Sequence, residues 1–408
     1  MRLACLAASP VYYQAPLYRR IAADPRIEFT AIFASTAGAT RPLVHGYGQP
    51  VEWGVDPLDG YKSIFLRRAD RNPPNGGVLA LRDLDVITLL IRERYDVLWL
   101  HGYHTVTHLA AALTQRLLGG SRLFREEQTL LSPRPRWKTA IKAIGLPTLF
   151  RGSYGLFIGT ENRRWFMRWG LSEQRLFHAP YVVDNEAFKA AARELEPRRQ
   201  QIRADLGIDS GSGPIILSVS RLISKKQPLH LLEAFRRVRE KHQCTLLIVG
   251  SGPLERKLRE KVAAERMPDV VFAGFLDQNE ISRAYVAADI FALVSSHNET
   301  WGLVVNEAMN FGLPIVVSDR VGSASDLVQG GHNGCVVPYN DIDALVAALE
   351  RLVVSPDLRA QFARASLDTI APRTYEVTAD GVVAAVRAAV GEYRWALANS
   401  YGREGMRA

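Results

Sequence analysis

The chain has 408 residues, which exceeds the roughly 250–300 residues that one hydrophobic core organises, so two domains are expected. With 47% hydrophobic and 23% charged residues, its composition excludes disorder and a fibrous repeat, and no apolar run approaches the roughly 20 residues of a membrane span. The net charge of +9 lies entirely in residues 1–190, because residues 191–408 are neutral.

Short apolar runs typical of strands alternate with longer helical patterns along the first half of the chain. This alternation indicates a parallel sheet with helices on both faces. Residues 1–190 are therefore expected to form a Rossmann-like N-terminal domain. Its predicted strands are residues 3–8, 29–33, 97–101, 123–125, 156–159 and 177–184, and residues 106–118 are a predicted helix.

Much of the positive charge falls in one basic segment, residues 134–168, which holds eight Lys and Arg residues and a single acidic one, Glu161. An apolar stripe with a basic flank suits an anionic membrane surface, while a helix face exposed only to solvent is the equal alternative. No aromatic-rich nucleic-acid signature accompanies the charge, so nucleic acid is not an expected partner. The interleaved apolar residues are Trp137, Ile141, Ile144, Leu146 and Leu149.

A second series of strands and helices follows a boundary expected near residues 185–200. Residues 191–371 are predicted to form a second Rossmann-like domain, and the long helical pattern of residues 372–408 is expected to pack back on the first. Ligands of open parallel sheets bind outside the carboxyl ends of the strands, so two such domains facing each other would enclose one cleft. The predicted strands are residues 215–220, 245–249, 270–273, 290–294, 314–318 and 334–337.

A basic turn, S-R-L-I-S-K-K-Q at residues 220–227, follows the first strand of this second series. The planar fork of Arg221 and the point charge of Lys226 suit a diphosphate and can neutralise a leaving group as its charge grows. A turn that is merely solvated is the plainer alternative. A second turn, V-G-S-G-P-L at residues 249–254, lets a ligand approach the backbone closely but lacks the third glycine of a dinucleotide fingerprint.

The strongest signal spans residues 295–309, where a buried strand ends, a loop carries Glu299 and a helix begins near Gly302. The amides at such a helix start form an anion site. Glu307, one to two turns inside the helix, could accept hydrogen bonds from both hydroxyls of a ribose, while Glu299 could reach a transferred sugar. In the alternative interpretation, Glu299 caps the helix and Glu307 is solvated.

Three histidines, His101, His104 and His108, suggest a metal site, since the last two lie one helical turn apart. No cysteine or carboxylate nearby completes a ligand set, so no metal is predicted. The three cysteines of the chain lie far apart, which fits a reducing cytoplasm.

Glu299 and Glu307 form the E-x7-E pattern of the family 4 retaining glycosyltransferases, and the chain resembles that family over roughly residues 214–340. The basic turn, the G-S-G-P turn, A-G-F-L at residues 273–276 and G-L-P at residues 312–314 fall in the family's order and spacing. The resemblance implies an α/β fold of two Rossmann-like doubly wound domains facing across a cleft, called GT-B. It also implies a retaining, metal-independent enzyme of the hexosyltransferase type.

The resemblance further implies roles for eight donor-site residues. Arg221 and Lys226 would hold the donor diphosphate with the amides of Gly302 and Leu303. Gly252 and the backbone near Phe275 would face the nucleotide base, Glu307 would bind the ribose hydroxyls, and Glu299 would contact the transferred sugar. Of these, the expected catalytic residues are Glu299, Arg221 and Lys226.

The N-terminal half departs from the family pattern. Many members carry a Gly-Gly loop after the first strand, where this chain has P-V-Y-Y at residues 10–13, and many place a histidine where it reads R-E-E at residues 125–127. In the second half, Trp301 stands where phenylalanine is commoner, and Gln227 replaces the usual glycine. The predicted contacts to the acceptor or the sugar are Tyr12, His101, His104 and Glu126.

The sequence therefore predicts transfer of a sugar from a nucleoside-diphosphate sugar, a co-substrate that needs no further cofactor, to a glycan, glycolipid or polyprenyl-linked acceptor. Such a step would serve the synthesis of cell-surface polysaccharide or glycoconjugate. The expected location is the cytoplasm, with the inner face of the cell membrane as the surface that the basic segment would contact. A nucleotide-sugar epimerase on the same fold and a non-catalytic scaffold that binds a sugar nucleotide are the alternatives.

Overall fold

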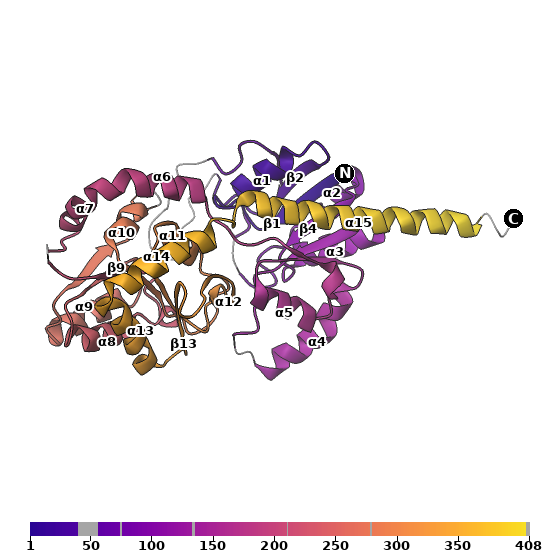
Figure 1. The fold of residues 1–408 in the computed structure, drawn as a ribbon. Coiled ribbons are helices and arrows are strands. Elements are labelled where there is room, and N and C mark those ends of the chain that lie inside the picture. The colour runs from indigo at the N-terminus through magenta and orange to yellow at the C-terminus, as the bar shows by residue number, and fades with distance from the viewer. Residues whose placement is uncertain (40–55, 74–75, 133–134, 210, 278–279, 405–408) are drawn as a thin grey trace.

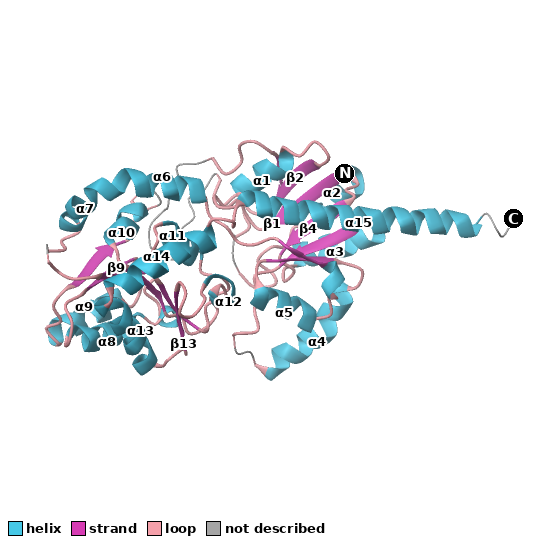
Figure 2. Cartoon of the chain, viewed as in Figure 1, coloured by secondary structure: helices cyan, strands magenta, loops and turns pink. Residues whose placement is uncertain are grey.

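The computed structural model describes residues 1–39, 56–73, 76–132, 135–209, 211–277 and 280–404, with side chains up to residue 391. These residues form two α/β units, each built on one sheet whose strands are all parallel (Figure 1). Helices enclose the strands of both units (Figure 2). The predicted fold class, two parallel α/β sheets, is confirmed.

The N-terminal sheet has seven strands in the order β3-β2-β1-β4-β5-β6-β7. The sequence did not predict β3, because this short strand at the sheet edge is only partly buried and so lacks a continuous apolar run. The strands are β1 (Arg2–Ala7), β2 (Glu28–Phe33), β3 (Lys62–Phe65), β4 (Val97–His101), β5 (Ser121–Arg125), β6 (Tyr154–Phe157) and β7 (Leu176–His178).

Helices cover both faces of this sheet. One face packs against α1 (Ala15–Ala22) and against α15 (Tyr375–Glu404), the last helix of the chain. The other face packs against α2 (Asp85–Glu93), α3 (Val106–Leu117), α4 (Arg136–Phe150) and α5 (Thr160–Arg168). A 3-10 turn, Glu173–Arg175, precedes β7.

The last predicted strand of this domain is shorter than expected, since β7 ends at His178 and residues 179–184 are not in a strand. Pro180 has no amide to donate to a sheet. The segment instead crosses between the domains: Val182 packs in the N-terminal core, whereas Tyr181 and Val183 pack in the C-terminal core.

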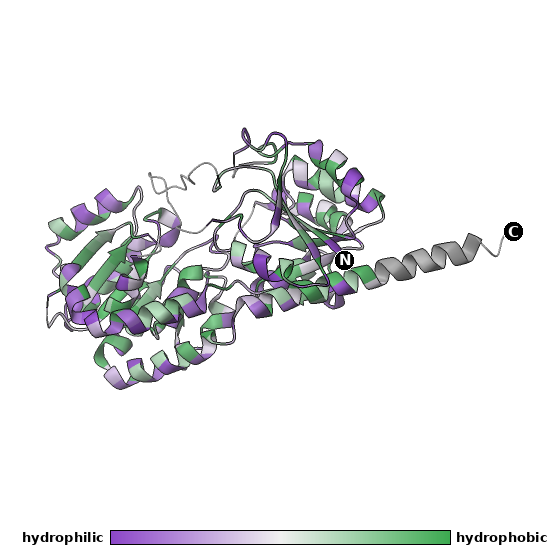
Figure 3. Ribbon diagram, turned by 90° about the horizontal axis from the view of Figure 1, so that it is seen from above, coloured by the Kyte–Doolittle hydropathy of each residue, from purple (hydrophilic) through white to green (hydrophobic). Residues whose placement is uncertain are grey.

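The C-terminal sheet has six strands in the order β10-β9-β8-β11-β12-β13. Hydrophobic residues concentrate on the strands and on the helix faces turned toward them (Figure 3). The strands are β8 (Ile215–Val219), β9 (Thr245–Val249), β10 (Val270–Gly274), β11 (Ile290–Leu293), β12 (Ile315–Ser318) and β13 (Gly334–Val337).

The helices of this second unit also lie on both faces of its sheet. Helices α10 (Ile281–Ala287), α11 (Leu303–Asn310) and α12 (Ala324–Leu327) pack on one face. Helices α8 (Pro228–Arg239), α9 (Glu255–Ala264), α13 (Ile342–Val354) and α14 (Pro356–Ile370) pack on the other. The unit is entered through α6 (Asn185–Leu195) and α7 (Arg199–Asp205), with 3-10 turns at Glu196–Arg198 and Ser224–Lys226.

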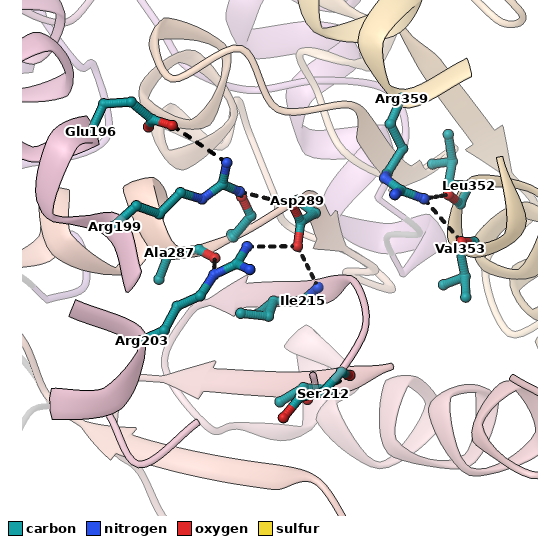
Figure 4. A network of polar contacts seen from close by, with 12 residues as sticks. Glu196, Arg199, Arg203, Ser212, Ile215, Ala287, Asp289, Leu352, Val353 and Arg359 are labelled. Atoms are coloured by element: carbon teal, nitrogen blue, oxygen red, sulfur yellow. Dashed lines mark hydrogen bonds and ion pairs between the residues drawn. The ribbon is translucent and has the colours of Figure 1, made fainter. Parts of the chain in front are cut away.

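The entry helix α7 is fixed to the sheet through one carboxylate (Figure 4). Asp289, just before β11, accepts hydrogen bonds from Arg199 at 2.8 Å, from Arg203 at 2.9 Å and from the amide of Ile215 at 2.8 Å. Burial lowers the pKa of Arg203, and Asp289 counteracts that effect. The start of β8 is thereby held against the chain that leads into it.

The C-terminal helix α15 returns to the N-terminal domain. The hydroxyl of Tyr375 donates to the carbonyl of Tyr13 at 3.1 Å, and the hydroxyl of Thr378 donates to the carbonyl of Pro180 at 2.9 Å. A Cβ at Gly381 would lie 1.8 Å from the carbonyl oxygen of His178, so only glycine permits this close approach. The chain thus crosses twice between the domains, once before α6 and once before α15.

The domains also meet between the start of α5 and α12. Thr160 donates its amide at 3.0 Å and its hydroxyl at 2.9 Å to the carboxylate of Asp326. Beside it, a Cβ at Gly159 would lie 2.4 Å from a ring carbon of the buried Trp301 and 2.7 Å from Asp326. Glycine is therefore the residue that lets the two domains close on each other here.

We expect Gly159→Ala to lower the free energy of unfolding by about 1–3 kcal/mol, because an added methyl overpacks this contact. Trp301→Phe removes the clashing ring atoms, so the double variant should be more stable than the sum of the single effects predicts. Thermal unfolding of the four proteins measures this coupling, and Trp301→Phe alone is the control. Strictly additive effects would contradict the contact.

Candidate functional site

A cavity of about 430 Å³ lies between the domains, where the carboxyl ends of β1, β8 and β9 meet. The N-terminal domain contributes Tyr12, Tyr13 and Pro16, the crossing segments contribute Val183, Asp184, Phe188 and Tyr375, and the C-terminal domain provides the remaining wall. That wall consists of Val219, Ser220, Arg221, Ile223, Lys225, Lys226, Val249, Gly250, Phe275, Leu276, Asp277, Ile281, Glu299, Gly302, Leu303, Val304 and Glu307.

The site occupies the topological switch point of the C-terminal sheet. Strand order reverses between β8 and β11, since β9 and β10 lie on one side and β12 and β13 on the other. Loops that follow the two strands diverge at such a point and leave a crevice for a ligand. The loop after β8 carries Lys226 and the loop after β11 carries Glu299, and both side chains line the cavity.

These two side chains form an ion pair across the crevice, with Lys226 Nζ bonded to Glu299 Oε2. The hydroxyl of Ser295 donates to the same carboxylate oxygen at 2.9 Å. Both charged side chains are nearly buried, at 13% and 11% exposure. Glu299 therefore does not cap the following helix, and an anion that enters the cavity competes with its carboxylate for Lys226.

The two loops are also joined through their backbones. The amide of Ser296 donates to the carbonyl of Lys225 at 2.7 Å, and Lys225 Nζ donates to the carbonyl of Asn298 at 3.2 Å. Burial lowers the pKa of Lys225, while Glu299 acts in the opposite direction. Lys225 thus brings a second ammonium group to the cavity wall, which the sequence did not single out.

The turn after β8 is held in a left-handed conformation at its last residue. Gln227 has φ 50° and ψ 45°, which explains why glycine would be favoured at this position. Its side chain is hydrogen-bonded to Asn340, and α8 begins at the next residue. The glutamine therefore keeps the turn in place despite the departure from the family pattern.

Helix α11 presents its amino end to the cavity. Gly302 precedes it in a left-handed conformation, φ 91°, and makes no side-chain cap. Its neighbours Leu303 and Val304 also line the cavity. The first amides of a helix have no partner inside the helix and carry a partial positive charge. Together with Arg221 and Lys226, they make this side of the cavity suited to an anion.

Glu307 lies deeper, on the second turn of α11. Its Oε2 accepts a hydrogen bond of 2.6 Å from the hydroxyl of Tyr285, whose ring stacks on Phe311. Burial raises the pKa of Glu307, and the hydrogen bond from Tyr285 offsets part of that rise. The carboxylate is consequently oriented by Tyr285 and only partly exposed, which disfavours the alternative of a solvated side chain.

Seven of the eight residues predicted for the donor side line the cavity, and Gly252 does not. Gly250 takes part in the wall instead, next to Phe275 and Leu276. Gly252, at φ 157°, packs against the backbone of Leu222, where a Cβ would lie 2.6 Å from the carbonyl oxygen. Its role in this structure is close packing of two turns.

Of the four residues predicted for the acceptor side, Tyr12 lines the cavity and His101 lies at the switch point of the N-terminal sheet, between β1 and β4. Gln14 Nε2 is 3.2 Å from His101 Nδ1, and His101 Nε2 is 3.3 Å from Glu127 Oε1. Glu127 also accepts a hydrogen bond from Tyr181. The carboxylate that faces His101 is therefore Glu127, one residue beyond the predicted Glu126.

His104 and Glu126 lie near Gly102, together with His108. A Cβ built on Gly102 would be 3.8–3.9 Å from polar atoms of all three side chains. Burial lowers the pKa of His108 to about 3, so its ring is neutral. Among the residues that the structure describes, no three His, Cys, Asp or Glu side chains are grouped so that they could hold a metal ion.

The stretch of residues 198–368 matches the family model described as Glycosyl transferases group 1. Alpha-D-kanosaminyltransferase from Streptomyces kanamyceticus is 30% identical over 195 residues, 47% of this chain and 49% of that protein. Alpha-monoglucosyldiacylglycerol synthase from Streptococcus pneumoniae is 29% identical over 183 residues, 44% of this chain and 39% of that protein. The chain thus matches half or less of the length of these relatives.

Similarity of structure extends over both domains. The crystal structure of HepE from Anabaena, in complex with UDP and glucose, has a TM-score of 0.68 with 16% sequence identity, and the match covers 95% of this chain and 100% of that chain. This likeness shows the fold, and the predicted arrangement of two Rossmann-like domains is confirmed. The predicted resemblance of the second half of the chain is confirmed as well.

Proposed function

We propose that this chain is a retaining glycosyltransferase that uses a nucleoside-diphosphate sugar, because residues 198–368 match the model of the glycosyl transferases group 1 family. The observation that carries the proposal is the single cavity in which Arg221, Lys226, Glu299 and Glu307 come together. One end of the cavity carries cations, which suit a diphosphate, and the other end carries an oriented carboxylate, which suits the hydroxyls of a ribose.

The nucleotide lies along the C-terminal wall. Its diphosphate contacts Arg221, Lys226 and the amides at the start of α11, where the helix dipole adds to the positive potential. The ribose hydroxyls donate to Glu307, and the base fits beside Gly250 and Phe275. No metal ion is required in this arrangement, since the cations of the protein neutralise the diphosphate.

In the reaction, the acceptor hydroxyl attacks the anomeric carbon from the face on which the diphosphate leaves. The bond from that carbon to the phosphate oxygen breaks, a bond to the acceptor oxygen forms, and the departing phosphate oxygen takes the acceptor proton. Lys226 and Arg221 stabilise the charge that develops on the leaving group. Glu299, released from its ion pair when the diphosphate takes Lys226, holds the transferred sugar.

The acceptor is a glycan, a glycolipid or a polyprenyl-linked sugar that enters from the N-terminal side, past Tyr12 and Tyr13. The name of one relative, alpha-monoglucosyldiacylglycerol synthase, supports a glycolipid within this range. We propose that His101, which contacts Glu127, orients an acceptor hydroxyl. The enzyme would then work in the cytoplasm, on cell-surface polysaccharide or glycoconjugate.

The experiment is incubation of the purified protein with UDP-, GDP-, ADP- and dTDP-sugars, each with and without short glycan and glycolipid acceptors. Transfer with retained anomeric configuration, read by nuclear magnetic resonance of the product, supports the proposal. An isomeric sugar nucleotide formed without acceptor would identify an epimerase. Tight donor binding without turnover on any acceptor would identify a scaffold.

A further inference from the structure

Helix α4 exposes an unusual amount of apolar surface. Trp137, Ile141 and Ile144 are 62%, 63% and 79% exposed. The helix buries only Leu146 and Phe150, near its C-terminal end, against the N-terminal core. Its first two turns therefore have no apolar partner among the residues that the structure describes.

The three exposed side chains lie on one face of the helix. At about 100° per residue, positions 137, 141 and 144 fall within about 60° of each other around the axis. Leu146 and Leu149, which the sequence grouped with them, are buried and half-buried in the core, so the stripe comprises three residues. We call Trp137, Ile141 and Ile144 the apolar stripe of α4.

Positive charge flanks this stripe and no acidic residue interrupts it. Arg136 lies on one side and Lys138 on the other, and α4 contains neither Asp nor Glu. The bases of α5 contribute less than the sequence suggested, since Arg163 pairs with Glu173 and Arg164 pairs with Glu161. Arg134, part of the predicted basic segment, lies outside the described residues.

In sequence, the stripe lies a few residues after a segment that contacts the loop carrying Glu299. The hydroxyl of Ser132 accepts a hydrogen bond of 2.8 Å from the amide of Asn298, next to Glu299. The carbonyl of Leu131 accepts one of 2.9 Å from Arg320. Since α4 begins four residues after Ser132, its amino end follows this contact between the domains closely in the chain (Figure 1).

We propose that the apolar stripe of α4 and its basic flank dock on an anionic lipid bilayer. Tryptophan and isoleucine on one side of a helix enter the boundary between headgroups and acyl chains, while flanking Lys and Arg contact anionic headgroups. This position brings the loop that carries Glu299 near the lipid surface, from which a lipid-linked acceptor can be delivered. Only this last point, delivery of a lipid-linked acceptor, rests on the proposed function; the docking itself does not.

Charge complementarity favours lipid over the other occupants of such a surface. A second copy of this chain would place one basic α4 against another, with like charges opposed. None of the helices that the structure describes is both long enough and apolar enough to cross a bilayer. Contact with a membrane through this part of the chain would therefore be peripheral.

The test is sedimentation of the full chain with vesicles of phosphatidylglycerol or of phosphatidylcholine at low salt. The wild type should bind the anionic vesicles, and Trp137→Ser/Ile141→Ser/Ile144→Ser should bind at least about tenfold more weakly. Lys138→Gln should weaken binding about fivefold, as expected for one surface cation. The matched control is Val336→Ser/Val354→Ser/Val377→Ser, which removes three exposed apolar residues elsewhere and should bind as the wild type does.

Failure of the wild type to bind anionic vesicles, or equal binding by the stripe variant, would overturn the proposal. A wild-type dimer that the stripe variant converts to a monomer, with no change in lipid binding, would assign the surface to a second copy. Donor hydrolysis measured without vesicles separates the two proposals. It should be unchanged in the stripe variant, and lipid binding by a protein that turns over no donor would leave the docking standing.

Discussion

Lys226→Ala is expected to reduce the rate of sugar transfer by about 10²–10³-fold, the range seen when one preorganised group that stabilises developing charge is removed. The lysine is nearly buried and its only side-chain bond in the described structure is to Glu299. In the proposed reaction it exchanges that carboxylate for the leaving diphosphate. The loss should fall mainly on kcat, because charge on the leaving group is largest in the transition state.

Steady-state kinetics with the preferred donor and acceptor measures this effect. Lys226→Arg should recover part of the activity, because the charge is kept while its geometry changes. Lys241→Ala removes a lysine that pairs with Glu350 on the surface and should leave the rate unchanged. A Lys226→Ala enzyme with wild-type kcat would show that the ion pair is structural and that the leaving group is stabilised elsewhere.

Glu307→Ala is expected to weaken donor binding by at least about 100-fold. Removing a carboxylate that accepts hydrogen bonds from two hydroxyls costs about 1.5–3 kcal/mol of binding free energy for each bond. Tyr285→Phe keeps the carboxylate and removes only the 2.6 Å hydrogen bond that orients it, so about a tenfold loss is expected. Calorimetric titration with the preferred donor compares the two variants, and equal binding by Glu307→Ala and the wild type would remove Glu307 from the site.

The same residue sets a pH dependence. Burial holds the pKa of Glu307 above its ordinary value of 4.5, and only the ionised form accepts from both ribose hydroxyls. Donor affinity should therefore fall as the pH is lowered through this raised pKa. Glu307→Gln should bind weakly at every pH and should lack this transition, and a wild type without the transition would contradict the assignment.

The effect of Glu307 on stability has the opposite sign. Its pKa in the folded chain exceeds that in the unfolded chain, so the folded state binds the proton more tightly. The stabilisation that follows is present at low pH and is lost as the pH rises from 4.5 through the folded pKa. At neutral pH, the charged carboxylate in the cavity is thus expected to lower the free energy of unfolding relative to the protonated form.

The sequence predicted the elements whose physics is local. Buried parallel strands such as β9 are continuous apolar runs in the sequence. The start of the helix after β11 is indicated by Gly302 and by the carboxylates around it. The edge strand β3 and the end of β7 at His178 were missed or misplaced, because partial burial and a nearby proline decide them.

The parts of the site that escaped prediction depend on contacts distant in sequence. Tyr285 orients Glu307 from another helix, and Tyr375 reaches the cavity because α15 returns from the far end of the chain. Glu127 rather than Glu126 faces His101, a difference of one residue at the end of β5. Consecutive residues at the end of a strand point to different sides of the sheet. The motif alone does not say which of them faces His101.

The measurement that tests the central claim most directly is hydrogen exchange of the backbone amides with and without each of four donors, UDP-, GDP-, ADP- and dTDP-sugar. The proposed site predicts that one donor binds and protects the turn at residues 220–227 and the start of α11 at residues 302–305. Glu307→Ala and Lys226→Ala should lose that protection. Binding that protects other segments, or no binding of any donor, would contradict the assignment of this cavity to a sugar nucleotide.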